Sequence, residues 1–215
     1  GADRGSLSLD GGCEISGGIN LGGVDCGLAD SQQNELVSKV AQANPNTVVV
    51  ASVPGAFLMP WVHEVKAVLT NFMPGQQAGN AIADVLFGKV NPSAKLPITL
   101  PNKENEIDFL QSQYPGLGKD DGLKHAVYSE KLLVGYRYYD ANGINFTKGF
   151  PFGHGLSYTT FEYSGLSISG RDVSFEVRNT GSTAGREVAQ LYLAFPAAAQ
   201  EPPLQLKGFT KTALL

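Results

Sequence analysis

Apolar residues recur with a helical period in the segment AGNAIADVL. They stand at i, i+3, i+4, i+7 and i+8, which is one apolar stripe of an amphipathic helix, and they are Ala78, Ala81, Ile82, Val85 and Leu86. Pro74 and Gly75 interrupt the chain before this stripe, and Gly88 follows it as a C-terminal cap. We therefore expect a helix here, followed by a short edge strand in KLPITLP at residues 95–101, which is bounded by prolines.

Helix and strand patterns alternate in the preceding part of the chain. Residues 31–43 place Leu36, Val37, Val40 and Ala41 on one helical face, and Asn44-Pro45 ends the pattern. TVVVASV, at residues 47–53, is a continuous apolar run typical of a strand that is buried on both faces, and VKAVLTNF, at 65–72, is a second strand candidate. The alternation predicts an α/β domain. Residues 102–127 are polar and rich in turn residues, which predicts a long surface loop.

The pattern changes to period two from Tyr163 onward. LSIS, DVSFEVRN and REVAQLYLAF alternate apolar and polar residues and are separated by turn sequences, which is typical of an antiparallel β-sandwich. We therefore divide the chain into domains at 1–162 and 163–215. Only about four strands fit before Leu215, whereas such a sandwich has about seven, so the second domain is expected to be truncated and sensitive to proteases.

The composition is that of a globular protein. Of the 215 residues, 42% are hydrophobic and 17% are charged. The net charge of −4 and the lack of a basic cluster argue against nucleic acid or an anionic membrane as a partner. No apolar run approaches the roughly 18–20 residues of a membrane-spanning helix. The first residue is Gly1, so a signal peptide can be neither recognised nor excluded.

Most chemically suggestive side chains have a simpler structural interpretation. Glu130 and Asp140 flank GYRYY, but their spacing favours pairing with Arg137 or capping of a turn over a catalytic pair. His154 lies among glycines and aromatic residues, where a hydrogen-bonded structural role is favoured over that of a base. Asp84, close to an apolar stripe, is interpreted as an internal hydrogen-bond acceptor. Trp61 is interpreted as a packing residue rather than a sugar platform.

Cysteines, histidines and one sequon bear on the compartment and on metals. Cys13 and Cys26 bracket a glycine-rich loop, and both a disulfide and two free thiols are compatible with the sequence. With His63 and His125 they show no metal-ligand spacing. Asn145-Phe146-Thr147 is an N-glycosylation acceptor on a predicted turn, with Asn145 as the modified residue, and its use would imply secretion.

Several segments resemble glycoside hydrolase family 3. Residues 72–101 resemble a signature of the family's second domain, PGQxxGxAxADVLFGxxNPSGKLPxT, nearly residue for residue. VVVASVPGAFLMPW, YSEKLLVGYRYYD and FPFGHGLSYTTFEYSGL resemble further family motifs in the same order, with Lys131 at a position where glycine is usual. Residues 177–211 resemble the family's fibronectin type III-like domain. The resemblance implies an α/β sandwich domain followed by a truncated, all-β, immunoglobulin-like sandwich.

The resemblance also implies a chemistry. Retaining hydrolysis of a β-glycosidic bond needs two carboxyl groups about 5–5.5 Å apart. In the family, the nucleophilic aspartate lies in an N-terminal barrel domain, and the acid/base glutamate of many members lies in a stretch resembling SxEGxDR. This chain begins GADR, so Gly1 follows the position of that glutamate, and no catalytic residue is expected within the sequence. Asp3 and Arg4 match the family's DR pair, and Ala2 takes a position that lines the aglycone site in some members.

The implied function is that of part of a retaining, exo-acting β-glucosidase acting on terminal non-reducing β-D-glucosyl residues. The substrate would be a β-glucoside or oligosaccharide, the missing barrel would be the partner domain, and no metal or organic cofactor is needed. We expect a secreted parent protein and an inactive fragment. Residues 10–30 are an insertion that either shapes leaving-group specificity or is a plain surface loop. A non-catalytic carbohydrate-binding or adhesive module remains the alternative, and β-xylosidase is the nearest alternative activity.

Overall fold

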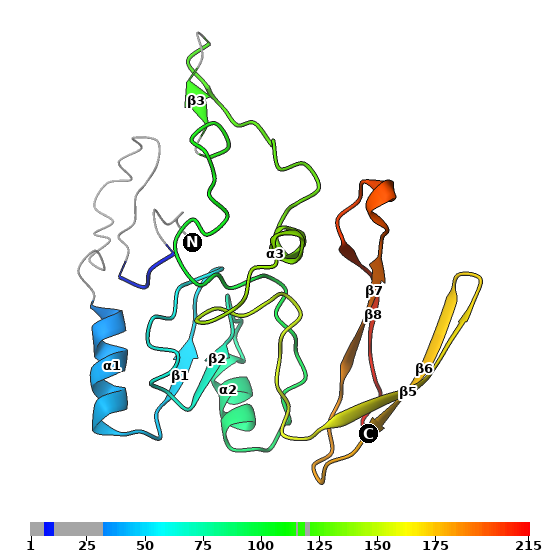
Figure 1. The fold of residues 1–215 in the computed structure, drawn as a ribbon. Helices are drawn as coiled ribbons and strands as arrows, with labels where there is room; N and C mark the ends of the chain where they lie inside the picture. The colour runs from blue at the N-terminus through cyan, green and yellow to red at the C-terminus, as the bar shows by residue number, and fades with distance from the viewer. Residues whose placement is uncertain (1–6, 11–31, 115, 119–120) are drawn as a thin grey trace. The chain divides into compact units, whose positions relative to one another are not determined.

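The computed structural model describes residues 7–10, 32–114, 116–118 and 121–215 (Figure 1). The chain divides into two compact units. Unit 1 comprises Gly1–Pro74 and Ile98–Pro151, and unit 2 comprises Gly75–Pro97 and Phe152–Leu215. Each unit is therefore built from two stretches of sequence. The sequence-based domain boundary at residue 162 stays a prediction.

Unit 1 contains the predicted first helix and first two strands. Helix α1 spans Gln33–Ala43, β1 spans Val48–Ala51 and β2 spans Ala67–Thr70. The strands pair in parallel, with Val48 opposite Ala67, and α1 lies alongside β1 (Figure 1). The expectation that this run is buried on both faces is wrong, because Val48 and Val50 are 44% and 37% exposed. A strand is buried on both faces only where other elements cover both faces of its sheet. The described residues leave one face of β1 uncovered.

The densest packing of unit 1 lies in the loop after β1. Phe57, Met59 and Trp61 are the largest fully buried side chains among the described residues, with exposed fractions of 0%, 1% and 0%. They alternate along an extended loop, so the odd-numbered positions point inward. An irregular segment thus supplies this core, although loops usually run over the surface.

The rest of unit 1 is mostly irregular. Strands β3 (Leu117–Gly118) and β4 (Lys124–His125) form a very short antiparallel hairpin within the predicted loop. Helix α3 spans Tyr136–Asn142 and ends at Gly143, which has a φ of 59°. The sequence did not predict this helix, because YRYYDAN has no apolar stripe of helical period.

Helix α2, at Ala78–Leu86 in unit 2, confirms the predicted helix. Gly88 follows with a φ of 73°, a left-handed conformation that glycine adopts without strain. The predicted edge strand at 95–101 is wrong. Leu96 makes two backbone hydrogen bonds, donating to His154 O at 2.7 Å and accepting from Gly153 N at 2.8 Å. Beyond it, Leu100 pairs with Phe150 in an isolated antiparallel bridge, and the segment forms no continuous strand. Prolines at both ends of PITLP remove the N–H groups that a ladder needs.

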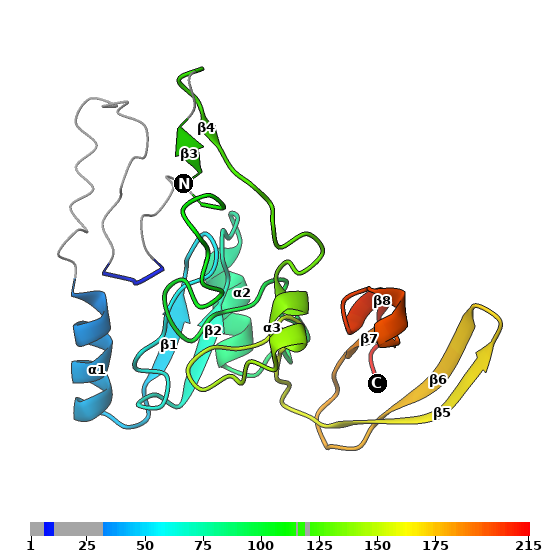
Figure 2. The same ribbon diagram turned by 45° about the horizontal axis from the view of Figure 1, so that its top comes forward.

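The three period-two segments lie in strands, and unit 2 contains four strands among its described residues, the number expected. They are β5 (Phe161–Ser169), β6 (Asp172–Asn179), β7 (Val188–Ala194) and β8 (Leu204–Lys211). Strands β5 and β6 pair antiparallel, as do β7 and β8, and Figure 2 shows each pair as a separate ribbon. A 3₁₀ turn, η1 (Ala197–Ala199), lies between β7 and β8. In the described ranges, no helix has the length and apolar character needed to cross a bilayer.

Candidate functional site

The candidate site is the set of contacts that hold residues 7–10 in unit 1. These residues closely follow, in sequence, those predicted to lie at the edge of the substrate site. Ala2, Asp3 and Arg4 themselves lie outside the described residues. The backbone of Leu7 is held from both sides: its carbonyl accepts from Leu58 N at 2.9 Å, and its N–H donates to Glu104 Oε2 at 2.9 Å. The segment is thus fixed to the loop that carries the buried core of unit 1.

Asp10 and Asn34 fix the other end of this segment. Asp10 Oδ1 accepts from the backbone N–H of Asn34 at 3.1 Å, and Asp10 Oδ2 accepts from Asn34 Nδ2 at 2.8 Å. The residue at the N-cap of α1, Gln32, makes no side-chain cap. The first N–H groups of a helix have no partner within the helix and need a capping acceptor. Asp10 supplies that acceptor for α1 from a segment that is distant in sequence.

Trp61 connects the same asparagine to the core. Its indole N–H donates to Asn34 Oδ1 at 2.8 Å, and its side chain is fully buried. The interpretation of Trp61 as a packing residue is confirmed, because a buried ring cannot offer a face to a sugar. Asn34 uses its carbonyl for Trp61 and its amide for Asp10 and for Ser8 Oγ, the latter at 3.2 Å.

Asn102 organises a second part of unit 1. Its Oδ1 accepts from three consecutive backbone N–H groups, those of Thr147, Lys148 and Gly149, at 2.7, 2.9 and 3.0 Å. Its Nδ2 donates to Asn145 O at 3.0 Å. The loop that carries the sequon is therefore shaped by one distant side chain. The side chain of Asn145 is exposed, as a modified residue would have to be.

Glu106 connects Asn102 to helix α3. Its carboxylate accepts from Asn102 N at 2.9 Å and from the hydroxyl of Tyr139 at 3.0 Å. Tyr139 is 6% exposed, and its ring stacks on Phe146 with centroids 5.3 Å apart. Burial, and next the neighbouring carboxylate of Glu106, raise the pKa of Tyr139 above its ordinary value. Tyr139 therefore remains a hydrogen-bond donor throughout the physiological pH range.

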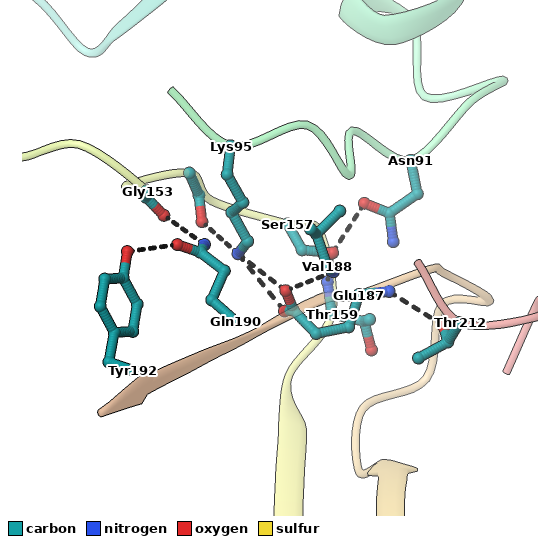
Figure 3. A network of polar contacts seen from close by, with 11 residues as sticks. Asn91, Lys95, Gly153, Ser157, Thr159, Glu187, Val188, Gln190, Tyr192 and Thr212 are labelled. Atoms are coloured by element: carbon teal, nitrogen blue, oxygen red, sulfur yellow. Dashed lines mark hydrogen bonds and ion pairs between the residues drawn. The ribbon is translucent and has the colours of Figure 1, made fainter. Parts of the chain in front are cut away.

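Unit 2 contains a compact polar network around Lys95 and Glu187 (Figure 3). Lys95 Nζ lies 3.0 Å from Glu187 Oε1 and donates to Gly155 O at 2.9 Å. Both side chains are largely buried, with exposed fractions of 19% and 11%. Gln190, on β7, donates to Gly153 O at 3.1 Å. Residues of the signature segment around Lys95 thus contact the first part of β7.

Asn91 completes this network. Its Oδ1 accepts from Ser157 Oγ at 2.8 Å (Figure 3). The same oxygen accepts from Tyr158 N at 2.8 Å, and Asn91 Nδ2 donates to Ala184 O at 3.2 Å. Asn91 therefore joins the segment after α2 to the segment that leads into β5 and to the loop before β7.

Three of the acidic candidates have surroundings that differ from their interpretations. In the part of the chain that the structure describes, neither Glu130 nor Asp140 forms an ion pair with Arg137. Glu130 instead accepts from Gln113 Nε2 at 2.9 Å, and burial raises the pKa of Asp140. Asp84 accepts a hydrogen bond, as interpreted, but its side chain is only half-buried. Its carboxylate pairs with Lys89 at 3.0 Å and is 33% exposed.

The histidines have structural partners. His63 Nε2 lies 2.6 Å from Thr147 O, and His125 Nε2 lies 2.6 Å from Asp121 Oδ2. Burial, and next the charge of Lys95, lower the pKa of His154, so its imidazole is neutral at pH 7. In the ranges described, no three histidine, cysteine or acidic side chains gather as a metal site would require. Cys13 and Cys26 lie outside those ranges, so their pairing stays a prediction.

The sequence did not single out the residues that organise these contacts. They are polar side chains within otherwise recognisable motifs: Asn34, Asn91, Lys95, Asn102, Glu106 and Glu187. One signal was available, because asparagine before proline, as at Asn91, marks a turn. The other contacts join residues that are between 4 and 97 positions apart, with Asn34 and Trp61 separated by 27. No periodic pattern in the sequence predicts such pairs.

The fold is thus an α/β unit associated with antiparallel β-ribbons of fibronectin type. The family described as "Glycosyl hydrolase family 3 C-terminal domain" matches residues 25–158, and the "Fibronectin type III-like domain" matches residues 187–215. Since the first match covers more than half of the chain, the chain belongs to glycoside hydrolase family 3.

Individual relatives agree with this assignment. The chain is 45% identical over 192 residues to "Thermostable beta-glucosidase B" of Acetivibrio thermocellus, covering 85% of this chain and 24% of the relative. It is 43% identical to "Beta-glucosidase B" of Emericella nidulans, covering 86% of this chain and 23% of the relative. It therefore spans about a quarter of the length of these curated relatives.

Solved structures show the same fold. β-Glucosidase 3B of Thermotoga neapolitana in complex with glucose matches with a TM-score of 0.76 and 33% identity, covering 100% of this chain and 28% of that one. DesR, a β-glucosidase of Streptomyces venezuelae in complex with D-glucose, matches with a TM-score of 0.76 and 39% identity, covering 84% and 24% of the two chains. The predicted fold class, an α/β domain with a fibronectin type III-like domain, is confirmed.

Proposed function

We propose that this chain is the C-terminal portion of a retaining, exo-acting β-glucosidase that hydrolyses terminal non-reducing β-D-glucosyl residues. The observation that carries the proposal is the 45% identity with a β-glucosidase over 85% of the chain. The substrate is a β-glucoside or an oligosaccharide, and the partner is a barrel domain of the same protein that supplies the nucleophile.

Within that enzyme, the chain's role is to position one edge of the sugar site. Residues 7–10 are held at Leu7 by Glu104 and Leu58, and at Asp10 by Asn34. Ala2, Asp3 and Arg4 precede this anchored segment by only a few residues. The anchored segment directly follows this part of the sequence, which supports a role of the segment at the edge of the sugar site.

The test compares two proteins. One is the 215-residue chain, and the other joins it to the sequence encoded upstream, including a barrel domain. Each is assayed for nitrophenol release from aryl β-glucoside and aryl β-xyloside. We expect glucoside hydrolysis only with the longer protein, because the two carboxyl groups of a retaining mechanism lie outside this chain. Hydrolysis by the short chain would contradict this assignment.

The same assay separates the alternatives. Faster release from the xyloside would assign the enzyme as a β-xylosidase. Sugar binding without hydrolysis by the longer protein would identify a carbohydrate-binding module instead. An upstream glutamate directly before Gly1, together with an aspartate motif in the barrel, supports the enzyme.

We also infer that the parent protein is secreted and glycosylated at Asn145. The exposed side chain of Asn145 supports this, as does the position of Thr147 at the third place of the sequon. Expression in a eukaryotic secretory host should give a protein that loses one glycan on treatment with an N-glycosidase. The Asn145→Gln variant should show no such loss, and an unmodified wild-type protein would contradict the inference.

A further inference from the structure

We propose that the Lys95–Glu187 ion pair determines how the β7–β8 ribbon docks on the signature segments 91–97 and 153–159. Lys95 lies in the region that matches the family's C-terminal domain, and Glu187 is the first residue of the region that matches the fibronectin type III-like domain. The pair is therefore a direct contact between the two matched regions, and it lies in unit 2 (Figure 3). This role is independent of glycoside hydrolysis.

Nearly all hydrogen-bonding positions of the two charged groups have a partner. Lys95 Nζ contacts both carboxylate oxygens of Glu187, at 3.0 and 3.4 Å, and the carbonyl of Gly155 at 2.9 Å. Glu187 Oε1 also accepts from Val188 N at 2.7 Å. An ammonium group has three N–H donors, so each donor has an acceptor. The desolvation cost of burying two charges offsets much of their attraction, but removal of either partner leaves the other charge without compensation.

Glu187 also connects the ion pair to the ends of both strands of the β7–β8 ribbon. Its backbone N–H donates to Thr212 Oγ1 at 3.1 Å, and its carbonyl accepts from Thr212 N at 2.9 Å. It directly precedes β7, while Thr212 directly follows β8. Fixing the carboxylate of Glu187 therefore fixes the end of the ribbon where the two strands meet the signature segments.

Glycines allow the close approach on which the pair depends. A Cβ on Gly155 would lie 2.3 Å from Ala94 O, and one on Gly153 would lie 2.4 Å from Gln190 Oε1. A Cβ on Gly185 would lie 2.6 Å from Asn91 Nδ2. The clash at Gly155 is with backbone, so a side chain there would push the segments apart, whereas the atoms met at Gly153 and Gly185 are the ends of the Gln190 and Asn91 side chains. The contacts are thus short-range and directional, as a docking determinant requires.

The electrostatic surroundings fit a pair that is shielded from water. Burial, and next the charge of Glu187, raise the pKa of Tyr163. Burial, and next the charge of Lys95, lower the pKa of His154. Each member of the pair therefore influences a neighbouring side chain, which is expected where solvent screens charges weakly.

The experiment uses the whole chain and a matched control pair. The test variants are Lys95→Met, Glu187→Gln and the double variant. The control variants are Lys89→Met, Asp84→Asn and their combination, since this ion pair has the same 3.0 Å separation but exposed fractions of 75% and 33%. Thermal midpoints are measured for each, together with hydrogen exchange at the amides of Leu96 and Gly153, which bond between the two signature segments.

Each single test variant should lower the thermal midpoint by about 5–10 °C, because it leaves a largely buried charge unpaired. The double variant should lower it by less than the sum of the two single effects. Each control variant should change it by no more than about 2 °C. Exchange should accelerate at Leu96 and Gly153 before it does so in the β5–β6 ribbon.

Additive single effects, or effects no larger than those of the control pair, would overturn the proposal. Equal acceleration of exchange throughout unit 2 would do so too, since it would indicate general destabilisation. If a single variant does not fold, the double variant Lys95→Met with Glu187→Gln gives the answer, because it leaves neither charge unpaired. Recovery of a folded protein by the double variant supports the pairing, and failure to recover opposes it.

Discussion

The indole N–H of Trp61 donates to Asn34 Oδ1 at 2.8 Å, although the two residues are 27 positions apart. Trp61 is fully buried, and the amide of Asn34 bonds to Asp10. One asparagine thus joins the core of unit 1, the start of helix α1 and the segment next to the predicted substrate edge.

Replacing Asn34 should destabilise the chain more than an ordinary surface substitution. The Asn34→Ala variant leaves a buried indole N–H without an acceptor, and we expect a loss of roughly 2–3 kcal/mol in the free energy of unfolding. Urea denaturation followed by tryptophan fluorescence measures it directly, since Trp61 is the only tryptophan. The control is Asn80→Ala in the exposed part of α2, which should change it by no more than about 0.5 kcal/mol. Equal effects would contradict the role of Asn34.

Asn102 should be a second position where a single side chain matters. The Asn102→Ala variant removes the acceptor of three backbone N–H groups, at Thr147, Lys148 and Gly149. We expect a loss of roughly 2–4 kcal/mol in the free energy of unfolding, because several donors lose their partner together. Asn44→Ala is the comparison, since Asn44 Oδ1 accepts from one backbone N–H, that of Asn46. A smaller loss at Asn102 than at Asn44 would argue against this account.

Lys131 should be replaceable by glycine with a gain in stability. Its φ is 51°, and glycine is usual at this position in the family motif. A left-handed conformation is unfavourable for a residue with a Cβ, so Lys131→Gly is expected to raise the free energy of unfolding by up to about 1 kcal/mol. Lys103→Gly, at an exposed lysine without positive φ, should lower it by about 0.5–1 kcal/mol. Denaturant midpoints of the two variants should therefore move in opposite directions.

Two glycine-to-alanine substitutions in unit 2 should also have opposite effects. At Gly155 a Cβ would lie 2.3 Å from Ala94 O, whereas at Gly79, inside α2, it would meet nothing within 4 Å. We expect Gly155→Ala to lower the free energy of unfolding by roughly 1–3 kcal/mol through overpacking. Gly79→Ala should raise it by up to about 1 kcal/mol through helix propensity. Thermal denaturation tests both predictions. An unchanged stability of Gly155→Ala would show that the segments around Ala94 and Gly155 can separate at little cost in free energy.

His154 should make stability depend on pH. Burial and the charge of Lys95 lower its pKa in the folded chain below the ordinary value of 6.5. The unfolded chain therefore binds this proton more readily, and the stabilisation present above about pH 6.5 is lost as the pH falls through the folded-state pKa. One such group gives a slope of at most about 1.4 kcal/mol per pH unit. Urea denaturation between pH 8 and 5 should show a smaller slope for His154→Gln than for the original chain, and equal slopes would exclude His154 as the source.

Local patterns predicted the elements whose residues repeat with a clear period. Helices α1 and α2 and strands β5, β6 and β7 lie where period 3.6 or period two is sustained and turn residues bound it. Residues 95–101 did not form the expected strand, because a pattern of apolar residues does not supply the N–H groups that proline lacks. Helix α3 was missed since its residues pack through rings and hydroxyl groups, as Tyr139 does on Phe146 and Glu106.

The sequence by itself determined the family and the change from α/β to β-ribbon pattern, because these depend on neighbouring residues and on matched motifs. Only the tertiary structure decided which polar side chains hold the parts together. Asn34 with Trp61, Asn102 with the 147–149 backbone, and Lys95 with Glu187 are pairs of distant residues. The Trp61–Asn34 and Lys95–Glu187 contacts are strengthened by burial, which removes water as an alternative partner, and that burial exists only once the chain has folded.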